Sequence, residues 1–322
     1  KGPASVLYGQ GSPGGIINYV SKTPQAGKDS EVVLSYGSFN RAQVSADINS
    51  ALSEDGKWLG RVVGIYRNSD SQVDYVTDDT QVLMPSISYL PNEDTTLTLM
   101  GLFQDTDSDT GAQFIPVEGT LLPLADGGYL PDQDVYAGEP GFNKFDTTSN
   151  QVTLLGEHII DSSTSVSFTA LWREGTADYH QAWPTFTGTS RYVNQYANAD
   201  IAPTETFVPR TFYQADNTFD QHAVDVRVSK WFTTGSVEHE LLIGGQYQHV
   251  DTDANSAYFF GGGALQGDFT YMLDLANPVY TGAPDQSVFD AIYNDAPSQE
   301  VGDIGVYLSD HISYDNWRFT LG

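Results

Sequence analysis

Residues 43–52, with the sequence QVSADINSAL, decide the fold because apolar and polar side chains alternate along them. A period of two is that of a β-strand with one apolar and one polar face. The same alternation recurs in residues 96–104, 165–173 and 223–229, and no segment has a convincing helical period. The sequence therefore predicts an all-β protein. The apolar positions of the first segment are Val44, Ala46, Ile48 and Leu52.

Extended along the chain, this pattern predicts eleven strands. We expect them at residues 31–38, 41–52, 58–69, 82–91, 95–105, 149–159, 164–174, 219–231, 237–250, 301–314 and 316–322. Most of these segments contain ten residues or more. A tilted strand needs about 9–11 residues to cross a bilayer, so the predicted strands are long enough to span a membrane.

The connections between the predicted strands alternate between short and long. The short ones are tight turns at residues 53–57, 91–94, 161–163, 233–236 and 315. Three of the long ones, at residues 106–148, 176–218 and 251–300, exceed the roughly 12–15 residues beyond which structureless loops are uncommon. Short turns at one end and long loops at the other are typical of outer-membrane barrels.

The polar face of the predicted strands separates two all-β architectures. That face carries charged and amide side chains, which suit a wet lumen better than the core of a soluble β-sandwich. No stretch approaches the ~20 apolar residues of a membrane helix. The pattern favours a transmembrane antiparallel β-barrel and leaves a soluble all-β protein as the alternative.

Composition excludes several functions. The formal net charge is −28, from 42 acidic and 14 basic residues, and such a field repels nucleic acid. Cysteine is absent, so the chain has no disulfide and no thiolate metal site. The six histidines form no H-E-x-x-H motif, and no G-x-S-x-G elbow occurs. We therefore expect no enzymatic activity.

The segment Gly9–Gly14, GQGSPG, matches the G-x-G-x-x-G pattern of dinucleotide-binding turns. That turn must lead into a helix, whereas the β-branched segment Ile16–Val20 follows here and indicates a strand. We therefore interpret the glycines as a tight turn between two strands.

Residues 2–24, GPASVLYGQGSPGGIINYVSKTP, closely resemble the end of the plug domain in TonB-dependent siderophore receptors of Gram-negative outer membranes. Residues 111–124 (GAQFIPVEGTLLPL), 275–279 (LANPV) and 305–310 (GVYLSD) are similar to the ferrichrome-receptor branch of that family. The resemblance spans essentially the whole chain.

In that family a plug fills a barrel of 22 strands, a class with a plugged lumen. The resemblance implies that residues 1–28 are the C-terminal end of the plug and residues 29–322 the first part of the barrel, about half of it. Both ends of the chain are then expected to be truncations, because most of the plug and the later strands are missing. Gly9, Gly11, Gly14 and Gly15 would allow a tight plug turn in a crowded lumen.

The resemblance also implies a ligand-binding set. Tyr8 stands where ferrichrome-type receptors carry a ligand-contacting tyrosine, and Gln113 and Phe114 stand where the family places aromatic contacts. Tyr8 could instead be a packed structural tyrosine, and each of the loop residues could instead pin its loop to the barrel wall. No cofactor is expected, because the iron arrives inside the siderophore. The other candidates in the long loops are Tyr179, Trp183, Tyr258, Phe259 and Phe260.

The charge of the three long loops limits the class of ligand that they could bind. A trianionic ferric catecholate would need arginines and lysines around it, and these loops contain only Lys144, Arg191 and Arg210. A neutral or cationic complex, such as a ferric hydroxamate, fits better.

Asp105, Asp107 and Asp109 match positions 1, 3 and 5 of a calcium loop. The glycine of the motif falls at position 7 rather than 6, and position 12 is Pro116 rather than glutamate. The three aspartates are therefore a weak calcium candidate, and a solvated acidic loop edge is the simpler interpretation.

The sequence thus predicts an outer-membrane importer of a ferric siderophore, with a ferrichrome-like hydroxamate as the expected class of cargo. TonB would supply the energy through parts absent from this chain, and outer-membrane lipid and lipopolysaccharide would surround the barrel. A receptor for cobalamin or a glycan, a passive porin or adhesin, and a soluble carbohydrate-binding protein stay open as alternatives.

Overall fold

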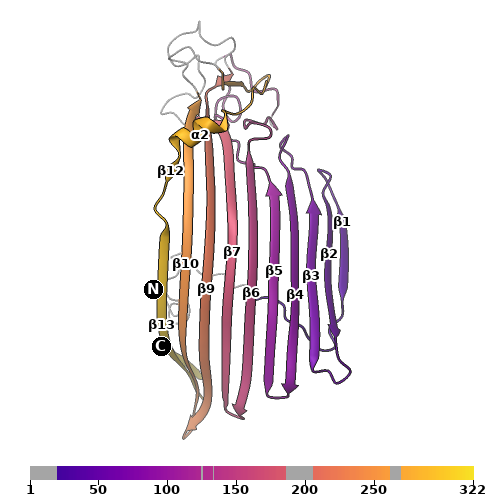
Figure 1. Ribbon diagram of the computed structural model, residues 1–322, viewed down its shortest axis with the longest axis vertical. Coiled ribbons are helices and arrows are strands. Elements are labelled where there is room, and N and C mark those ends of the chain that lie inside the picture. The colour runs from indigo at the N-terminus through magenta and orange to yellow at the C-terminus, as the bar shows by residue number, and fades with distance from the viewer. Residues whose placement is uncertain (1–19, 125, 133, 186–205, 262–269) are drawn as a thin grey trace.

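The structure is a computed structural model that describes residues 20–124, 126–132, 134–185, 206–261 and 270–322. Its framework is one curved antiparallel sheet, with long connections and a short helix at one end and tight turns at the other (Figure 1). The path through the sheet follows chain order, apart from two-residue strands in the long connections. Its strands are β1 (Glu31–Tyr36), β2 (Ala42–Ala51), β3 (Trp58–Asn68), β4 (Asp78–Asn92), β5 (Thr95–Ser108), β6 (Lys144–Asp161), β7 (Thr164–Pro184), β9 (Arg210–Thr234), β10 (Val237–Gly261), β13 (Gln299–Tyr314) and β14 (Trp317–Leu321).

All eleven predicted strands are confirmed, but several are much longer than predicted. β7 has 21 residues, and β9 and β10 have 25 each. Parts of the predicted long loops are therefore strand, so the predicted loop boundaries were wrong. The reason is that the outward face becomes polar beyond the membrane-crossing part. The two faces then no longer differ, and the alternation fades although backbone pairing continues.

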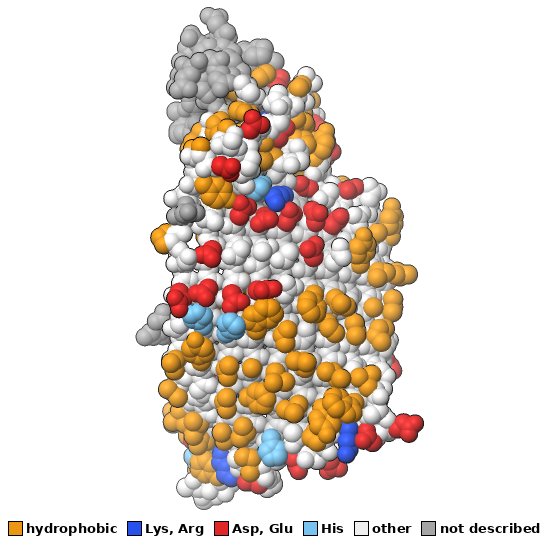
Figure 2. Space-filling view, in the orientation of Figure 1, with side chains coloured by type: hydrophobic (Ala, Val, Ile, Leu, Met, Phe, Trp, Pro, Cys, Tyr) orange, Lys and Arg blue, Asp and Glu red, His pale blue; other side chains and the backbone are white. Residues whose placement is uncertain are grey.

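One face of the sheet carries exposed apolar side chains in a broad band, which Figure 2 shows in orange across its lower half. We call this band the apolar belt. Its position on adjacent strands follows from the register, in which Val226 of β9 pairs with Gly245 of β10, and Gly245 pairs with Val306 of β13. Large side chains exposed on one face of a sheet suit contact with lipid. Members of the belt are Ile48, Val62, Leu83, Ile87, Leu99, Phe103, Val152, Leu154, Val224, Val226, Val228, Ile243, Tyr247, Ile304, Val306 and Leu308.

The opposite face is the inner wall of the barrel, and residues 20–28 are bonded to it. Arg61 of β3 forms a bidentate ion pair with Asp47 of β2, with both N–O distances at 2.7 Å, and donates to the Thr23 carbonyl at 2.8 Å. Asn49 of β2 accepts from the Gln25 amide at 2.9 Å and donates to the Gln25 carbonyl at 2.6 Å. The segment that precedes β1 is thus fixed to the wall at two points.

We expect Arg61→Ala to loosen residues 20–28. The buried guanidinium holds the Thr23 carbonyl, and losing charge-assisted hydrogen bonds of this kind costs about 2–3 kcal/mol. Amide hydrogen exchange followed by mass spectrometry should show faster exchange at Gln25 than in the parent. Arg41→Ala is the matched control. In the described part of the chain the Arg41 side chain donates to that of Gln43 and not to residues 20–28, so exchange at Gln25 should not change. Equal exchange in the two variants would contradict the role of Arg61.

The two buried hydrophobic clusters lie at the end of the sheet where the long connections meet it. Two-residue strands β8 (Phe207–Val208) and β11 (Leu273–Asp274) pair there, and β12 (Asn294–Asp295) pairs with β10. One buried cluster contains Leu130, Ala137, Val208, Leu273 and Leu275. The long connections therefore form a packed cap with its own core.

Helix α2 (Gln286–Ile292) belongs to this cap and was not predicted. Seven residues make two turns, too few to show a helical period in the sequence. Its buried Phe289 stacks on Phe142, with ring centroids 5.6 Å apart, and joins a second cluster with Phe212. The part of the chain that the structure describes contains no helix with the length and apolarity needed to span a membrane.

Candidate functional site

Six aromatic rings come together where β6, β7, β9 and β10 reach the cap, and we call them the aromatic wall. They lie on the inner face: Tyr213 of β9 has the opposite parity to Val224, which belongs to the apolar belt, and the β9–β10 register is unbroken between them. The members are Phe114, Phe145, Tyr179, Trp183, Tyr213 and Tyr258.

Tyr213 is the centre of the aromatic wall. Its ring centroid lies 4.3 Å from that of Tyr258, 5.7 Å from that of Tyr179 and 6.3 Å from that of Trp183. Phe114 extends the wall from the loop side, at 6.3 Å from Trp183. These separations are those of tilted and edge-to-face aromatic pairs, which hold one another in place. The rings thus form an ordered apolar surface edged with hydroxyl groups.

Four of the predicted ligand residues, Phe114, Tyr179, Trp183 and Tyr258, are brought together in the aromatic wall. Tyr179, Trp183 and Tyr258 lie on strands rather than in the loops where the sequence placed them. Phe260 has the same parity as Tyr258 and is exposed.

Phe259 and Gln113 have other surroundings. Phe259 points to the opposite face, where its ring lies 5.4 Å from Tyr271 and 6.4 Å from Phe212 in the cap core. The Gln113 side chain accepts a hydrogen bond from the Ala137 amide at 2.6 Å, which ties the first long connection together. Both residues therefore act here in packing and loop shape.

The sequence analysis missed Tyr213 and Phe145. Tyr213 was placed inside a loop, although it pairs directly with Tyr258 across β9 and β10. Phe145 likewise pairs with Tyr179 across β6 and β7. Extending the strand register upward from the apolar belt would have found both.

The two basic residues of the predicted loops that the structure describes, Lys144 and Arg210, are directed away from the aromatic wall. Arg210 is fully buried and paired with Glu139 at 2.8 Å. Lys144 pairs in register with His180 on the outward face and lies 3.5 Å from Asp178. The polar groups of the wall are the phenol hydroxyls and the Trp183 indole Nε1, which is buried without a hydrogen-bond partner in the described part of the chain. This surface suits an uncharged ligand.

Several predicted residues lie outside the described residues. They are Tyr8, Gly9, Gly11, Gly14, Gly15 and Arg191.

The three aspartates of the calcium candidate follow an extended backbone. Asp105 and Asp107 are alternate residues of β5, so their Cα atoms are about 6.8 Å apart along the strand. Asp109, just beyond the strand, accepts hydrogen bonds from the Thr77 amide at 3.0 Å and the Thr77 hydroxyl at 2.8 Å. The segment is strand and strand end rather than a chelating loop.

No protein-family model matches this chain, but individual proteins do. It is 29% identical over its whole length to the ferrioxamine B receptor of Salmonella typhimurium strain SL1344, and 27% identical to the ferrichrome outer membrane transporter/phage receptor of Escherichia coli K12. The chain spans 42% and 43% of the length of these two relatives.

Solved structures agree on the fold. The closed form of the ferric-catecholate import receptor of Escherichia coli K12 superimposes with a TM-score of 0.78 at 18% identity, covering 98% of this chain and 43% of that one. The pyoverdine outer membrane receptor of Pseudomonas aeruginosa PAO1 gives a TM-score of 0.71 at 19% identity, covering 97% and 41%. The comparisons confirm the predicted resemblance to TonB-dependent siderophore receptors, the partial transmembrane β-barrel and the outer-membrane location.

Proposed function

We propose that the protein containing this chain is an outer-membrane receptor that binds a ferric hydroxamate siderophore and imports it with energy delivered through TonB. The observation that carries the proposal is the aromatic wall, an ordered set of six rings from which the described basic residues of the long connections, Lys144 and Arg210, are directed away. Relatives named as receptors and transporters for ferrioxamine B and ferrichrome support transport rather than enzymatic chemistry.

The charge of the site supports the hydroxamate class. A trianionic ferric catecholate placed against the aromatic wall would lose hydration without gaining a cationic partner from it. A neutral or cationic hydroxamate complex has no such cost and can use the phenol hydroxyls as hydrogen-bond donors. The shared fold with a catecholate receptor does not decide the cargo, because one fold can present different sites.

A fluorescence titration of the full-length protein in detergent tests the cargo. We expect saturable, sub-micromolar quenching of tryptophan emission by ferrichrome or ferrioxamine B. A ferric tris-catecholate and cobalamin, added in parallel, should bind at least about tenfold more weakly, a difference of 1.4 kcal/mol or more. Tighter binding of the catecholate would contradict the charge argument, and tighter binding of cobalamin would favour another cargo.

The variant Trp183→Phe tests whether the siderophore binds at the aromatic wall. Trp183 lies in the aromatic wall, whereas Trp317 lies on β14 near the tight turns. Trp183→Phe should remove much of the quenching while retention of radiolabelled ferric siderophore on the protein persists. Trp317→Phe, the matched control, should keep both signals. Uptake of the same label by cells, with and without a protonophore, tests the energy requirement separately.

A further inference from the structure

Four carboxylates lie directly opposite one another on the outward face, on the cap side of the apolar belt. Glu174 of β7 pairs with Asp220 of β9, Asp220 pairs with Asp251 of β10, and Asp251 pairs with Glu300 of β13. We call these four residues the acidic row, and Figure 2 shows acidic side chains gathered above the belt. Like charges in directly opposite positions of an antiparallel sheet destabilise it. β10 and β13 contain no lysine or arginine to offset them.

Two histidines lie between the acidic row and the belt. His222 and His249 pair with each other across β9 and β10. Each also approaches a carboxylate two residues away on its own strand: His222 Nε2 lies 2.9 Å from Asp220 Oδ1, and His249 Nε2 lies 3.2 Å from Asp251 Oδ2. His249 differs because the same Nε2 atom also lies 3.7 Å from Glu300 Oε1 on the neighbouring strand.

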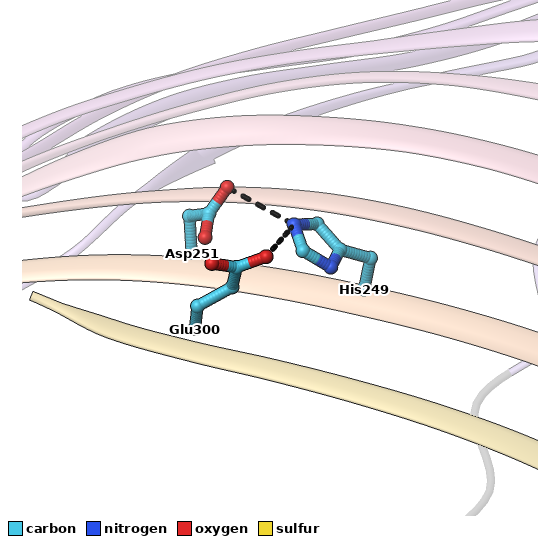
Figure 3. Close-up of side chains that lie close together, drawn as sticks. All are labelled: His249, Asp251 and Glu300. Carbon is cyan, nitrogen blue, oxygen red and sulfur yellow. Dashed lines mark hydrogen bonds and ion pairs between the residues drawn. The ribbon is translucent and has the colours of Figure 1, made fainter.

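The side chains of His249, Asp251 and Glu300 point toward one another from β10 and β13 (Figure 3). One ligand atom from each lies within 4.8 Å of the others. Zinc binds nitrogen and oxygen at about 2.0–2.2 Å in tetrahedral geometry, which places ligand atoms about 3.3–3.6 Å apart. The observed separations of 3.2 and 3.7 Å from Nε2 lie on either side of that value. The three side chains therefore need little movement to hold an ion.

We propose that His249, Asp251 and Glu300 bind a divalent transition-metal ion such as Zn²⁺ on the outward face of the barrel. An imidazole with two carboxylates suits a borderline ion, whereas Mg²⁺ and Ca²⁺ prefer oxygen ligands alone. The ion supplies the positive charge that the acidic row lacks. Because Asp251 and Glu300 are exposed, the fourth position is open to water.

A groove beside this site supports access from solvent. It has a volume of about 390 Å³ and is lined on the outward face by Glu174, Asp220 and Asp251, together with Asn150. Asp251 is thus shared between the groove and the proposed ion. The inference is independent of the siderophore, because the outward face is separated from the aromatic wall by the sheet itself.

The test measures zinc bound by the full-length protein in detergent after treatment with a chelator. The wild-type protein and His249→Ala are each equilibrated with Zn²⁺, desalted and analysed for metal by mass spectrometry. We expect His249→Ala to hold one equivalent less than wild type. His222→Ala is the matched control, since it removes the corresponding histidine of β9 and should leave the count unchanged.

Glu300→Gln tests the site without changing side-chain size. Its affinity for Zn²⁺, measured by isothermal titration, should fall at least about tenfold, since even outer-shell partners of a metal contribute that much. Equal zinc content in wild type and His249→Ala would overturn the proposal. So would equal losses in His222→Ala and His249→Ala, or displacement of Zn²⁺ by a modest excess of Mg²⁺. Circular dichroism of each variant distinguishes loss of the site from loss of the fold.

Discussion

Arg210→Ala will open the cap. Arg210 is fully buried at the start of β9, where its guanidinium pairs with Glu139 at 2.8 Å and donates to the carbonyls of Tyr271 at 2.9 Å and Gly138 at 2.6 Å. It thus joins the connection before β6 to the one between β10 and β13. Removing it leaves the Glu139 carboxylate buried without its counter-charge, which costs about 3–5 kcal/mol.

The loss should be confined to the cap. Native-state hydrogen exchange is expected to show that residues 134–139 and 271–282 open more easily by that free energy, while the paired core of β9 and β10 keeps its protection. The double variant Arg210→Met with Glu139→Leu replaces the pair by apolar groups and should recover much of the loss. Unchanged exchange in 134–139 after Arg210→Ala would show that the pair does not hold the cap together.

The cap also contains the buried phenol of Tyr136 and the half-buried phenol of Tyr280. Burial raises the pKa of Tyr280 to about 12, and it raises the pKa of Tyr136 well above its ordinary value. Both side chains therefore stay protonated at physiological pH. The Tyr280 hydroxyl donates to the Tyr136 carbonyl at 2.8 Å, a second link between the connections that Arg210 joins.

Tyr213→Ala will weaken siderophore binding more than any other single change in the aromatic wall. Its ring contacts those of Tyr179, Trp183 and Tyr258, so its loss removes one surface and the support of three others. Central aromatic residues of binding sites contribute about 2 kcal/mol or more. The dissociation constant of the ferric hydroxamate should therefore rise about 30-fold.

Two further variants separate the causes. Tyr213→Phe keeps the ring and removes the hydroxyl, so a small effect would assign the energy to ring contact and a large one to hydrogen bonding. Phe259→Leu changes the opposite face of β10 and should leave the dissociation constant within about twofold, well under 1 kcal/mol. A value for Tyr213→Ala within twofold of wild type would show that the cargo binds elsewhere.

The strands were predicted correctly within the apolar belt and less well beyond it. Where one face meets lipid, alternation reports the strand directly, and segments such as 223–229 were identified for this reason. Directly beyond the belt the outward residues of β9 are polar, at Asp220, Thr218 and Asp216, so the alternation is lost and Tyr213 was placed in a loop although its backbone continues the strand. Tyr258, Phe259 and Phe260 were all named as ligand candidates, but consecutive strand residues point to opposite faces. Alternation alone would have separated Phe259 from its neighbours.

The cap core could not be predicted from one sequence. Arg210 and Glu139 are 71 positions apart, in connections without any periodic pattern, and only their burial together shows that they pair. The same holds for Arg61 and Thr23, whose bond joins a strand to the segment before the sheet. Contacts of this kind form only when distant segments of the chain pack together, and they leave no local pattern in the sequence.

The unbroken pairing of β9 with β10 has a mechanical consequence. All 25 facing pairs, from Thr234–Val237 to Arg210–Gly261, keep one register without a bulge. Sliding or bending one strand relative to the other would break many backbone hydrogen bonds together. The β9–β10 pair is therefore rigid and holds Tyr213 and Tyr258 at a fixed position relative to the rest of the sheet. If a cargo binds there, as proposed, the β9–β10 pair does not close around it. Movement that traps or releases such a cargo is then expected from segments joined to the ends of these strands or from a body inside the lumen.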